Sequence, residues 1–441
     1  MKKVLTFTFV LVLALSIFTS CKPSGAEGSG KSGGVSLNVV TSFTGNDGNT
    51  NNYLEAINAW QDETGNTVND ASAVSDETFK ARIITDFETG AEPDVLMFFN
   101  GIDSNPFVEA GKVVSIDEIR EEYPDYASNM KEAMLGASPF DGKNYSVPVM
   151  GYWEGMYVNK KVLSEAGVEI PGADYTWEQF LVDCQKIKDA GFAPIAASLS
   201  GVPHYWFEFT IYNHLTPATH AMLPKSIDDV NGKAWVNGVN DIKALYEAGY
   251  FPDNTLSSTD DETFQMFIDD KAAFLIDGSW KANAIANMFA AAEGEEPDAE
   301  KLANFTVTYV PGKNERKATD IIGGLSSGYY ISRKAWEDPA KREAAVAFVT
   351  YMTSDAMVTK FAGTAATALK NGATPDESNL NSLQIESLKM LAGVTGIAPA
   401  VQDLIPTAAR VPLFEVGMPK IVSGEVSAED AVQQCLDLLA G

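Results

Sequence analysis

The chain has 441 residues, more than a single hydrophobic core usually organises, so we expect two domains. Hydrophobic residues make up 45% and charged residues 21%, a composition that supports a sizeable core and argues against wholesale disorder. The 60 acidic residues against 32 Lys and Arg give a net charge of −28, which would repel nucleic acid and anionic membranes. A soluble, extracytoplasmic protein with neutral ligands fits this charge better. Three dispersed cysteines, Cys21, Cys184 and Cys435, provide no disulfide framework.

The N-terminus is predicted to be a targeting segment. Two lysines follow Met1, and residues 4–18 form an apolar run that is too short to span a bilayer comfortably. Two small residues then precede Cys21, as in the lipobox of bacterial lipoproteins, although Phe18 stands where the lipobox usually has Leu. We therefore predict a signal peptide over residues 1–20. The alternative is an ordinary signal peptide followed by an incidental cysteine.

In the lipobox interpretation, Cys21 becomes the mature N-terminus and its thiol carries a diacylglyceryl group. Residues 21–34 comprise this cysteine and a stretch rich in Ser and Gly, which predicts a flexible linker between lipid and folded body. The mature protein would then be anchored to the cell membrane outside the cytoplasm, either in a periplasm or at the cell surface.

Strands and helices alternate in the first part of the folded chain. Alternating apolar residues predict a strand over 37–40, and a continuous apolar run predicts a buried strand over 93–99. Apolar residues at helical spacing predict helices over 53–60 and 79–87, each followed by Gly as a stop. This alternation favours an α/β fold with a mostly parallel sheet.

The same kinds of element continue along the chain. Thr176 is predicted to cap a helix, with Gln179 completing a capping box. The segment 274–280 is predicted to begin as a strand, which Gly278 and Ser279 break directly before Trp280. Further strands are predicted over 155–159, 272–276 and 327–332, and further helices over 160–166, 263–269, 342–352 and 427–439.

A series of short motifs is spread over nearly all of the mature chain. In chain order they are Glu63-Thr64-Gly65, Gly90-Ala91-Glu92-Pro93-Asp94-Val95, Gly142-Lys143-Asn144-Tyr145-Ser146-Val147-Pro148, Val158-Asn159-Lys160, Thr176-Trp177-Glu178-Gln179, and Phe267 to Phe274 followed by Gly278-Ser279-Trp280. Their order and spacing resemble the extracellular solute-binding proteins of ABC importers, specifically the sugar-binding family 1. Asp270 and Phe274 depart from the letters most common in that family.

The resemblance implies the periplasmic binding protein type II fold, in which two discontinuous α/β lobes enclose a ligand cleft. It places chain crossings near residues 148–152, 322–326 and 365–368. The N-terminal lobe would comprise residues 35–148 plus 322–365, and the C-terminal lobe residues 149–321 plus 366–441. Open α/β sheets bind ligands beyond the carboxyl ends of their strands, so the loops at these ends are the expected site walls.

Side chains at these strand ends and crossings are the candidate ligand contacts. Aromatic rings match the apolar faces of a sugar, and Asp, Glu, Asn and Arg match its hydroxyl groups. The candidates are Phe43, Thr44, Asn46, Asp47, Phe99, Asn100, Tyr152, Glu154, Tyr205, Trp206, Asp277, Trp280, Gly323, Gly324 and Arg410.

Core packing is the competing interpretation of each aromatic candidate. It is as well supported as ligand contact for Phe43, Phe99 and Trp206. Tyr152 and Trp153 would point to opposite faces of an extended segment, so we assign only Tyr152 to the cleft. Trp280 is the best-supported stacking platform, because the preceding Gly-Ser break would release it from the sheet.

The resemblance implies a carbohydrate-binding component of an ABC importer that acts as a monomer, docks on a membrane permease and needs no cofactor. A secreted glycosidase would need two carboxylates flanking the bond, for which Glu154 and Asp277 are the alternative pair. There is no G-x-S-x-G elbow, and the three histidines lack a metal-binding spacing. We therefore assign no catalytic residue and no metal ligand. Peptide or polyamine binding, and presentation of ligand to a membrane sensor, remain open alternatives.

Overall fold

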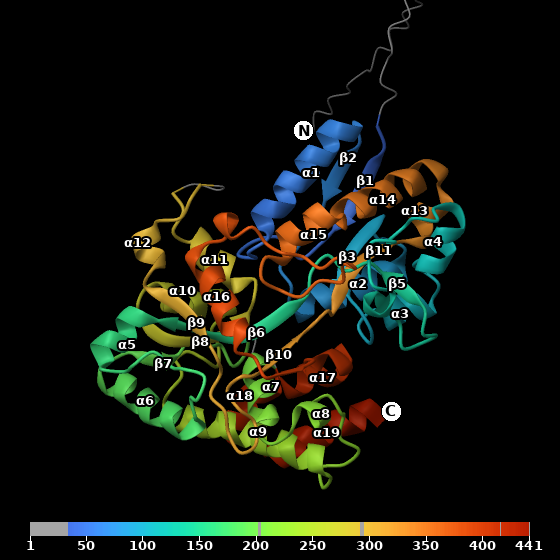
Figure 1. The fold of residues 1–441 in the computed structure, drawn as a ribbon. Coiled ribbons are helices and arrows are strands. Elements are labelled where there is room, and N and C mark those ends of the chain that lie inside the picture. Colours follow the sequence, from blue (N-terminus) through green and yellow to red (C-terminus); the bar gives the residue numbers. More distant parts are fainter. Residues whose placement is uncertain (1–33, 202–203, 292–294, 415, 441) are drawn as a thin grey trace, which may run out of the picture. The chain divides into compact units, whose positions relative to one another are not determined.

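The computed structural model describes residues 34–201, 204–291, 295–414 and 416–440 (Figure 1). The predicted signal peptide over 1–20, the predicted lipidation site Cys21 and the linker up to residue 33 lie outside the described residues. Within the described ranges, no helix is both long enough and apolar enough to cross a membrane.

Four strands form the first sheet, in the spatial order β11, β3, β1, β2. They are β1 (Ser36–Val40), β2 (Thr67–Asp70), β3 (Val95–Phe99) and β11 (Ser327–Ile331). β1 is parallel to both β2 and β3, and helices α1 (Thr50–Thr64) and α2 (Glu77–Thr89) make the predicted crossovers. Gly65 and Gly90 end these helices in the left-handed conformation, as predicted. β11 arrives from much later in the chain and pairs antiparallel with β3.

Six strands form the second sheet, in which β6 is central. They are β6 (Tyr152–Asn159), β7 (Ala193–Ile195), β8 (Ala272–Gly278), β9 (Phe305–Thr308), β10 (Asp320–Gly324) and β12 (Gly396–Ala398). β6 pairs antiparallel with β8 on one side and with β9 and β10 on the other. β7 and β12 extend the sheet as parallel partners of β8 and β10.

Helices cover both sheets. Those in the first part of the chain are α3 (Asn105–Glu109), α4 (Ile116–Glu122), η1 (Glu132–Met134), α5 (Lys160–Ala166), α6 (Trp177–Asp189), α7 (His204–Tyr212), α8 (Pro217–His220), α9 (Val230–Glu247), α10 (Asp260–Ile268), α11 (Lys281–Asn287) and α12 (Ala299–Leu302). Those in the last part are α13 (Arg333–Glu337), α14 (Pro339–Met352), α15 (Asp355–Ala362), η2 (Glu377–Asn379), α16 (Ser382–Ala392), η3 (Val401–Leu404), α17 (Thr407–Leu413), α18 (Gly417–Val422) and α19 (Ala428–Ala440). A two-stranded ribbon, β4 (Gly136–Ala137) with β5 (Asn144–Ser146), completes the fold. The Thr176–Gln179 capping box at α6 is confirmed.

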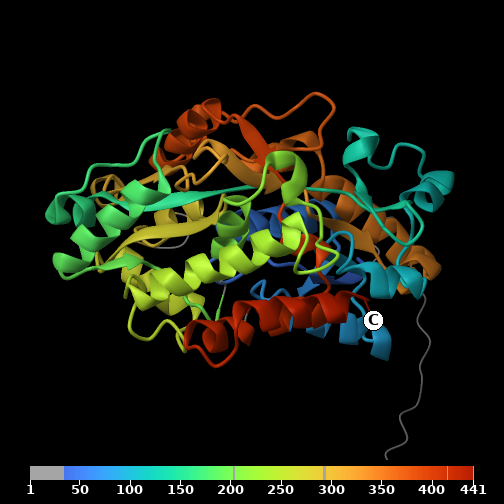
Figure 2. The same cartoon turned by 90° about the horizontal axis from the view of Figure 1, so that it is seen from below.

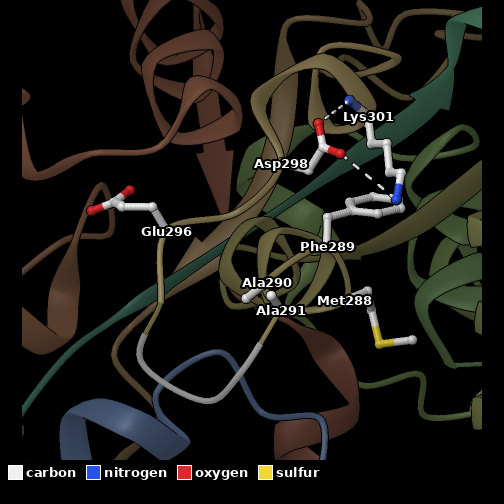
Figure 3. Close-up of a pocket in the computed structure, with 7 residues that line it drawn as sticks. All are labelled: Met288, Phe289, Ala290, Ala291, Glu296, Asp298 and Lys301. Atoms are coloured by element: carbon white, nitrogen blue, oxygen red, sulfur yellow. Dashed lines mark hydrogen bonds and ion pairs between the residues drawn. The ribbon is translucent and has the colours of Figure 1, made fainter.

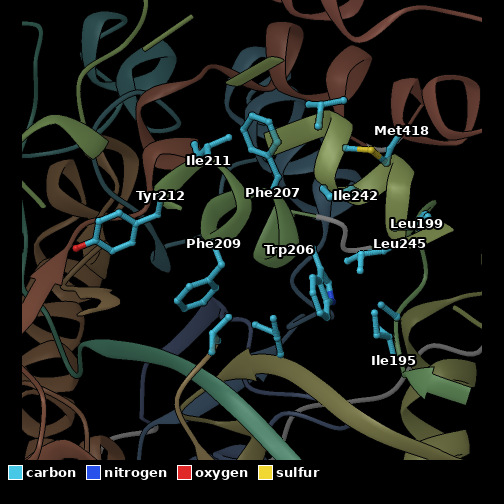
Figure 4. Packing of buried hydrophobic residues seen from close by; sticks show 14 of the residues in the cluster. Ile195, Leu199, Trp206, Phe207, Phe209, Ile211, Tyr212, Ile242, Leu245 and Met418 are labelled. Carbon is cyan, nitrogen blue, oxygen red and sulfur yellow. The ribbon is translucent and has the colours of Figure 1, made fainter. Parts of the chain in front are cut away.

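Buried hydrophobic side chains form separate clusters on the two sheets. One cluster joins β1 and β3 to α1 and α14 through residues such as Trp60 and Phe348, whose rings meet edge to face. The cluster around α7, α9 and α19 lies beside the second sheet (Figure 4), and α9 and α19 run side by side (Figure 2). Among the described residues, no cluster combines strand residues from both sheets. The predicted fold class of two α/β lobes is therefore confirmed, and we call them the first and the second lobe after their sheets.

The chain passes between the lobes at closely adjacent points. β10 ends at Gly324 in the second sheet, and β11 begins at Ser327 in the first. On the other crossing, Val147 bridges to Tyr329 of the first sheet shortly before β6 begins at Tyr152. Gly151, between them, donates a backbone hydrogen bond of 2.7 Å to the carbonyl of Ala366. The three predicted crossing segments therefore lie beside one another.

Gly151 has no room for a side chain. A Cβ atom there would lie 2.5 Å from the carbonyl oxygen of Gly324 and 2.8 Å from that of Ala366. Both are backbone atoms of the other crossings, so a methyl group would force the crossings apart.

We predict that Gly151→Ala lowers the free energy of unfolding by about 1–3 kcal/mol, the usual cost of overpacking a tight site. Denaturant titration of the purified protein measures this directly. Gly172→Ala is the matched control, because its added methyl group would meet only the Asp174 carboxylate, at 3.3 Å. Equal stability of the Gly151→Ala variant and wild type would contradict the proposed close packing of the crossings.

Candidate functional site

A cavity of about 290 Å³ lies where the two lobes meet. The first lobe contributes the loop after β1, the start of α2, the end of β3 and residues 326–327. The second lobe contributes the start of β6, the end of β8, the starts of α7 and α10, and η3. We call this cavity the interlobe pocket. It lies at strand ends, where the sheet topology places ligands in open α/β folds.

Most of the side chains predicted to contact ligand line this pocket. They are Thr44, Asn46, Asp47, Phe99, Tyr152, Glu154, Tyr205, Asp277 and Trp280. Residues that are distant in sequence thus come together at one cavity.

Phe43 and Trp206 do not line the pocket, and their assignment as ligand contacts is corrected. Each side chain is 1% exposed. The Phe43 ring packs on Tyr53 and Phe361 in the first lobe. Trp206 points into the second-lobe core, where its ring lies 5.9 Å from that of Phe180 (Figure 4). The core interpretation, which the sequence left open for both, is the one that the structure supports.

Asn100, Gly323 and Gly324 also lie outside the pocket lining. The Asn100 side-chain oxygen accepts hydrogen bonds from the hydroxyl groups of Ser146 and Tyr330, which fixes it beneath the strand end. Gly323 and Gly324 are strand residues of β10 and pair with the start of β6. Their backbone therefore joins the second sheet rather than contacting the pocket.

Arg410 joins the two lobes instead of lining the pocket. Its side chain is 2% exposed and donates hydrogen bonds to Glu77 (2.8 Å) and Asp103 (3.3 Å) of the first lobe. Burial disfavours the charge on Arg410, but these two carboxylates raise its pKa above the usual range. Burial would also raise the pKa of Glu77, but Lys80 and Arg410 lower it to about 2. Because Glu77 and Lys80 line the pocket, this buried ion network forms one of its walls.

Tyr152 and Trp153 point to opposite faces of β6, as predicted from strand geometry. Tyr152 lines the pocket, and its hydroxyl accepts a hydrogen bond from the backbone N–H of Ala400 (3.1 Å). Trp153 is 3% exposed and donates to the hydroxyl of Thr364 (3.2 Å) on the other face.

Trp280 is held at the end of β8 by an unusually close approach to Gly278. A Cβ atom on Gly278 would lie 2.2 Å from the nearest atom of the indole ring. The ring therefore covers the Gly278 backbone. Glycine is needed at this position because a side chain would clash with the indole, not because the backbone turns there. Tyr205 of α7 lies with its ring centre 6.3 Å from that of Trp280. Together the two rings form an aromatic wall of the pocket.

Asp277 and Lys281 form an ion pair on the same side. Their charged atoms are 2.9 Å apart, and Lys281 also lies 3.7 Å from Asp260. Burial raises the pKa of Asp277 to about 6, although the Lys281 ammonium opposes the shift. Burial disfavours the charge on Lys281, but Asp277 and Asp260 raise its pKa above the usual range.

Five further carboxylates line the pocket without a salt bridge to any Lys or Arg of the described chain: Asp47, Asp76, Glu154, Asp261 and Asp403. Desolvation raises the pKa of Asp47 to about 6, and burial raises that of Asp403 to about 7. Burial raises the pKa of Glu154 well above its usual range, and the nearby carboxylates of Glu208 and Asp403 add to the shift. The pocket is therefore polar, acidic and partly walled by aromatic rings.

Comparison with known protein families assigns the chain to one of them. The family described as "bacterial extracellular solute-binding protein" matches residues 46–359, well over half of the sequence. The chain belongs to this family. The resemblance seen in the sequence motifs is thereby confirmed.

Solved structures with the same fold agree with this assignment. A chitin oligosaccharide binding protein superposes with a TM-score of 0.77 at 21% identity, over 93% of this chain and 99% of that one. The GacH receptor of Streptomyces glaucescens, described in complex with acarbose, superposes with a TM-score of 0.69 at 18% identity, over 92% of this chain and 97% of that one. The maltose/maltodextrin-binding domain MalE of Bdellovibrio bacteriovorus, bound to maltotriose, superposes with a TM-score of 0.67 at 18% identity, over 91% of this chain and 98% of that one. At these identities the likeness establishes the shared fold.

Among curated proteins, a binding protein of Brucella abortus (strain 2308) is 26% identical over 155 residues. That match covers 34% of this chain and 36% of the relative, so this solute-binding protein aligns with about a third of that relative's length.

Sequence patterns did not indicate several residues that line the pocket of this solute-binding protein. They are Asp76, Glu77, Lys80, Asp260, Asp261, Lys281 and Asp403. Asp76 caps α2 by accepting a hydrogen bond from the N–H of Phe79 (2.6 Å), and acidic residues at a helix start usually have this local role. The one sequence feature that could have pointed to any of these residues is the position of Lys281 directly after Trp280, which was already a predicted ligand contact.

A second cavity, of about 330 Å³, lies around Met288, Phe289 and Lys301 (Figure 3). It is separate from the strand ends that form the interlobe pocket, and its chief polar contact is the exposed Asp298–Lys301 pair. In the part of the chain that the structure describes, no group of three or more His, Cys, Asp or Glu side chains is arranged to hold a metal ion.

We predict that Trp280→Ala weakens binding of the protein's solute about 25-fold, the effect of losing a hot spot worth about 2 kcal/mol. Stability of the empty protein should fall by less than the ~3–5 kcal/mol expected for emptying a core site. Gly278→Ala should weaken binding as well, because its methyl group displaces the indole. Calorimetric titration and denaturant unfolding measure the two quantities.

Trp336→Ala is the control for core packing, since Trp336 is 5% exposed and does not line the pocket. It should lower stability and leave affinity unchanged. The same pattern for Trp280→Ala, lost stability with unchanged affinity, would show that Trp280 is a packing residue.

Proposed function

We propose that this solute-binding protein binds a carbohydrate in the interlobe pocket and delivers it to the membrane permease of an ABC importer. The observation that carries the proposal is the combination of aromatic rings and carboxylates at one cavity. The rings of Tyr152, Tyr205 and Trp280 match the apolar faces of a sugar. Carboxylates such as Glu154 and Asp277 match its hydroxyl groups.

The ligands of proteins with similar structures support the same class of ligand. Those proteins are described with chitin oligosaccharide, acarbose or maltotriose. This chain shares their fold over more than nine-tenths of its length.

The lobes move about their crossings in this proposal. Residues 35–148 plus 322–365 would form one moving body, and residues 149–321 plus 366–441 the other. Ligand shifts the population toward a closed form, because it contacts both lobes only when they meet. The closed monomer would then dock on the permease.

The protein binds its ligand without chemistry in this proposal. Glu154 and Asp277 are the alternative hydrolase pair, and they lie on the adjacent strands β6 and β8. Asp277, however, is already paired with Lys281, 2.9 Å away. Binding of a peptide or a polyamine in the same pocket is the other alternative.

We predict binding of at least one saccharide from a panel of mono- and oligosaccharides, with no hydrolysis. Bound ligand should raise the melting temperature in a concentration-dependent way, and calorimetry should give the affinity. Reducing ends should not accumulate over hours with any bound oligosaccharide. Their release would show a glycosidase, and binding only of peptides or polyamines would contradict the carbohydrate proposal.

We also propose that Cys21 carries the lipid that anchors this protein outside the cytoplasm. The support is the pair of small residues before Cys21 and the Ser- and Gly-rich stretch after it. The family description as extracellular agrees with export.

Expression in a host with lipoprotein processing should give a membrane-associated protein whose N-terminal peptide begins at Cys21 and carries acyl mass. Cys21→Ser should release the protein from the membrane fraction, whereas Cys184→Ser, at a buried thiol, should leave it attached. An unmodified N-terminal peptide that begins elsewhere would contradict the lipoprotein proposal.

A further inference from the structure

The interlobe pocket is more acidic than the chain as a whole. The chain has 60 acidic residues against 32 Lys and Arg. The pocket is lined by the carboxylates of Asp47, Asp76, Glu77, Glu154, Asp260, Asp261, Asp277 and Asp403, and by the ammonium groups of Lys80 and Lys281. The proportion of acid to base is thus about twice that of the whole chain.

Both lysines are already bound by carboxylates of the protein. Lys281 lies 2.9 Å from Asp277 and 3.7 Å from Asp260. Lys80 lies 2.8 Å from Glu77. Neither ammonium group is therefore available to neutralise the carboxylates that remain.

Glu154 is the clearest of the remaining carboxylates. Its side chain is 1% exposed and lines the pocket from the start of β6. Its Oε2 atom is buried and has no hydrogen-bond partner among the described residues. A buried carboxylate without a partner is costly, because burial removes its hydration and nothing replaces it.

A cation supplied by the ligand would relieve this cost. The described Asp, Glu, His and Cys side chains form no group of three or more that could hold a metal ion. The aromatic wall of Trp280 and Tyr205 adds a second feature that attracts a cation, since ring faces are electron-rich.

We propose that the ligand is a saccharide that carries a protonated amine, and that its ammonium group pairs with Glu154. The inference rests on the proposed carbohydrate-binding function and narrows its substrate class. It replaces the neutral ligand that overall charge alone suggested. The rings would contact the sugar faces, and the unpaired carboxylates would select the amine.

The charges around Glu154 give this proposal a pH signature. The titratable groups that face Glu154 are Glu208 and Tyr205 of α7, Asp403 of η3, Asp277 of β8 with its partner Lys281, and Tyr152 of β6. Burial raises the pKa of Glu154 and Asp403, so both hold protons more tightly than free carboxylates do. An ammonium ligand favours their ionised forms, so its binding at pH 7 should release protons. Affinity should fall as the pH falls from 7 to 5.

The test uses matched pairs of saccharides. Glucosamine, galactosamine and mannosamine, with β-1,4-linked glucosamine oligomers, are compared by calorimetry with their N-acetylated forms and with the corresponding neutral sugars. Spermidine is included as a cation without a sugar ring. We expect at least one amine-bearing sugar to bind ten-fold or more tightly than its N-acetylated match. Titrations in buffers of different ionisation enthalpy should show proton release for that sugar only.

Glu154→Gln keeps the shape of the side chain and removes its charge. It should abolish the preference for the amine while the empty protein melts no lower than wild type. Glu88→Gln, at an exposed position of α2, is the control for a change in net charge and should leave the preference intact. If Glu154→Gln fails to fold, Asp403→Asn tests the same charge and should reduce the preference.

Equal or tighter binding of N-acetylated or neutral sugars, unaffected by Glu154→Gln, would overturn the amine proposal and leave the carbohydrate function standing. Binding of spermidine with no saccharide bound would overturn both.

Discussion

Close contact between the chain crossings at Gly151 is the constraint on which the rest of the structure depends. Its N–H binds the carbonyl of Ala366, and the Gly324 carbonyl occupies the space where a side chain would be. The first and second crossings leave this point as β6 and β11, in different sheets. The two lobes therefore share one narrow junction, and Gly151 and Tyr152 at that junction also line the pocket. The junction therefore forms part of the pocket wall.

Charge buried between the lobes is the second organising feature. Arg410 of the second lobe forms an ion pair with Glu77 of the first at 2.8 Å, whereas the buried Lys281–Asp277 pair, at 2.9 Å, lies within the second lobe. Buried ion pairs of this kind contribute little net stability but penalise any arrangement that separates the partners. The network thus favours one way of bringing the lobes together. In our proposal the ligand completes this arrangement at Glu154, whose Oε2 atom has no hydrogen-bond partner among the described residues.

Much of the fold and part of the site could be predicted from the sequence. The order of weak motifs indicated the lobes and the crossing segments, and strand alternation assigned Tyr152 rather than Trp153 to the pocket. An aromatic residue near a strand end, however, has the same local pattern whether it packs in a core or faces a cleft, and so Phe43 and Trp206 were assigned wrongly. Arg410 meets Glu77 across 333 positions of sequence, a contact that no local pattern contains. Asp403 follows a stretch with no recognisable motif, so its place in the pocket depends entirely on tertiary packing.

Native mass spectrometry of the protein isolated gently from cells that make it tests the central claim most directly. The account predicts a bound species that dissociates to a saccharide mass, and a mass that includes a free amino sugar would agree with the pairing of ligand and Glu154. A bound peptide or polyamine would contradict a carbohydrate-binding pocket.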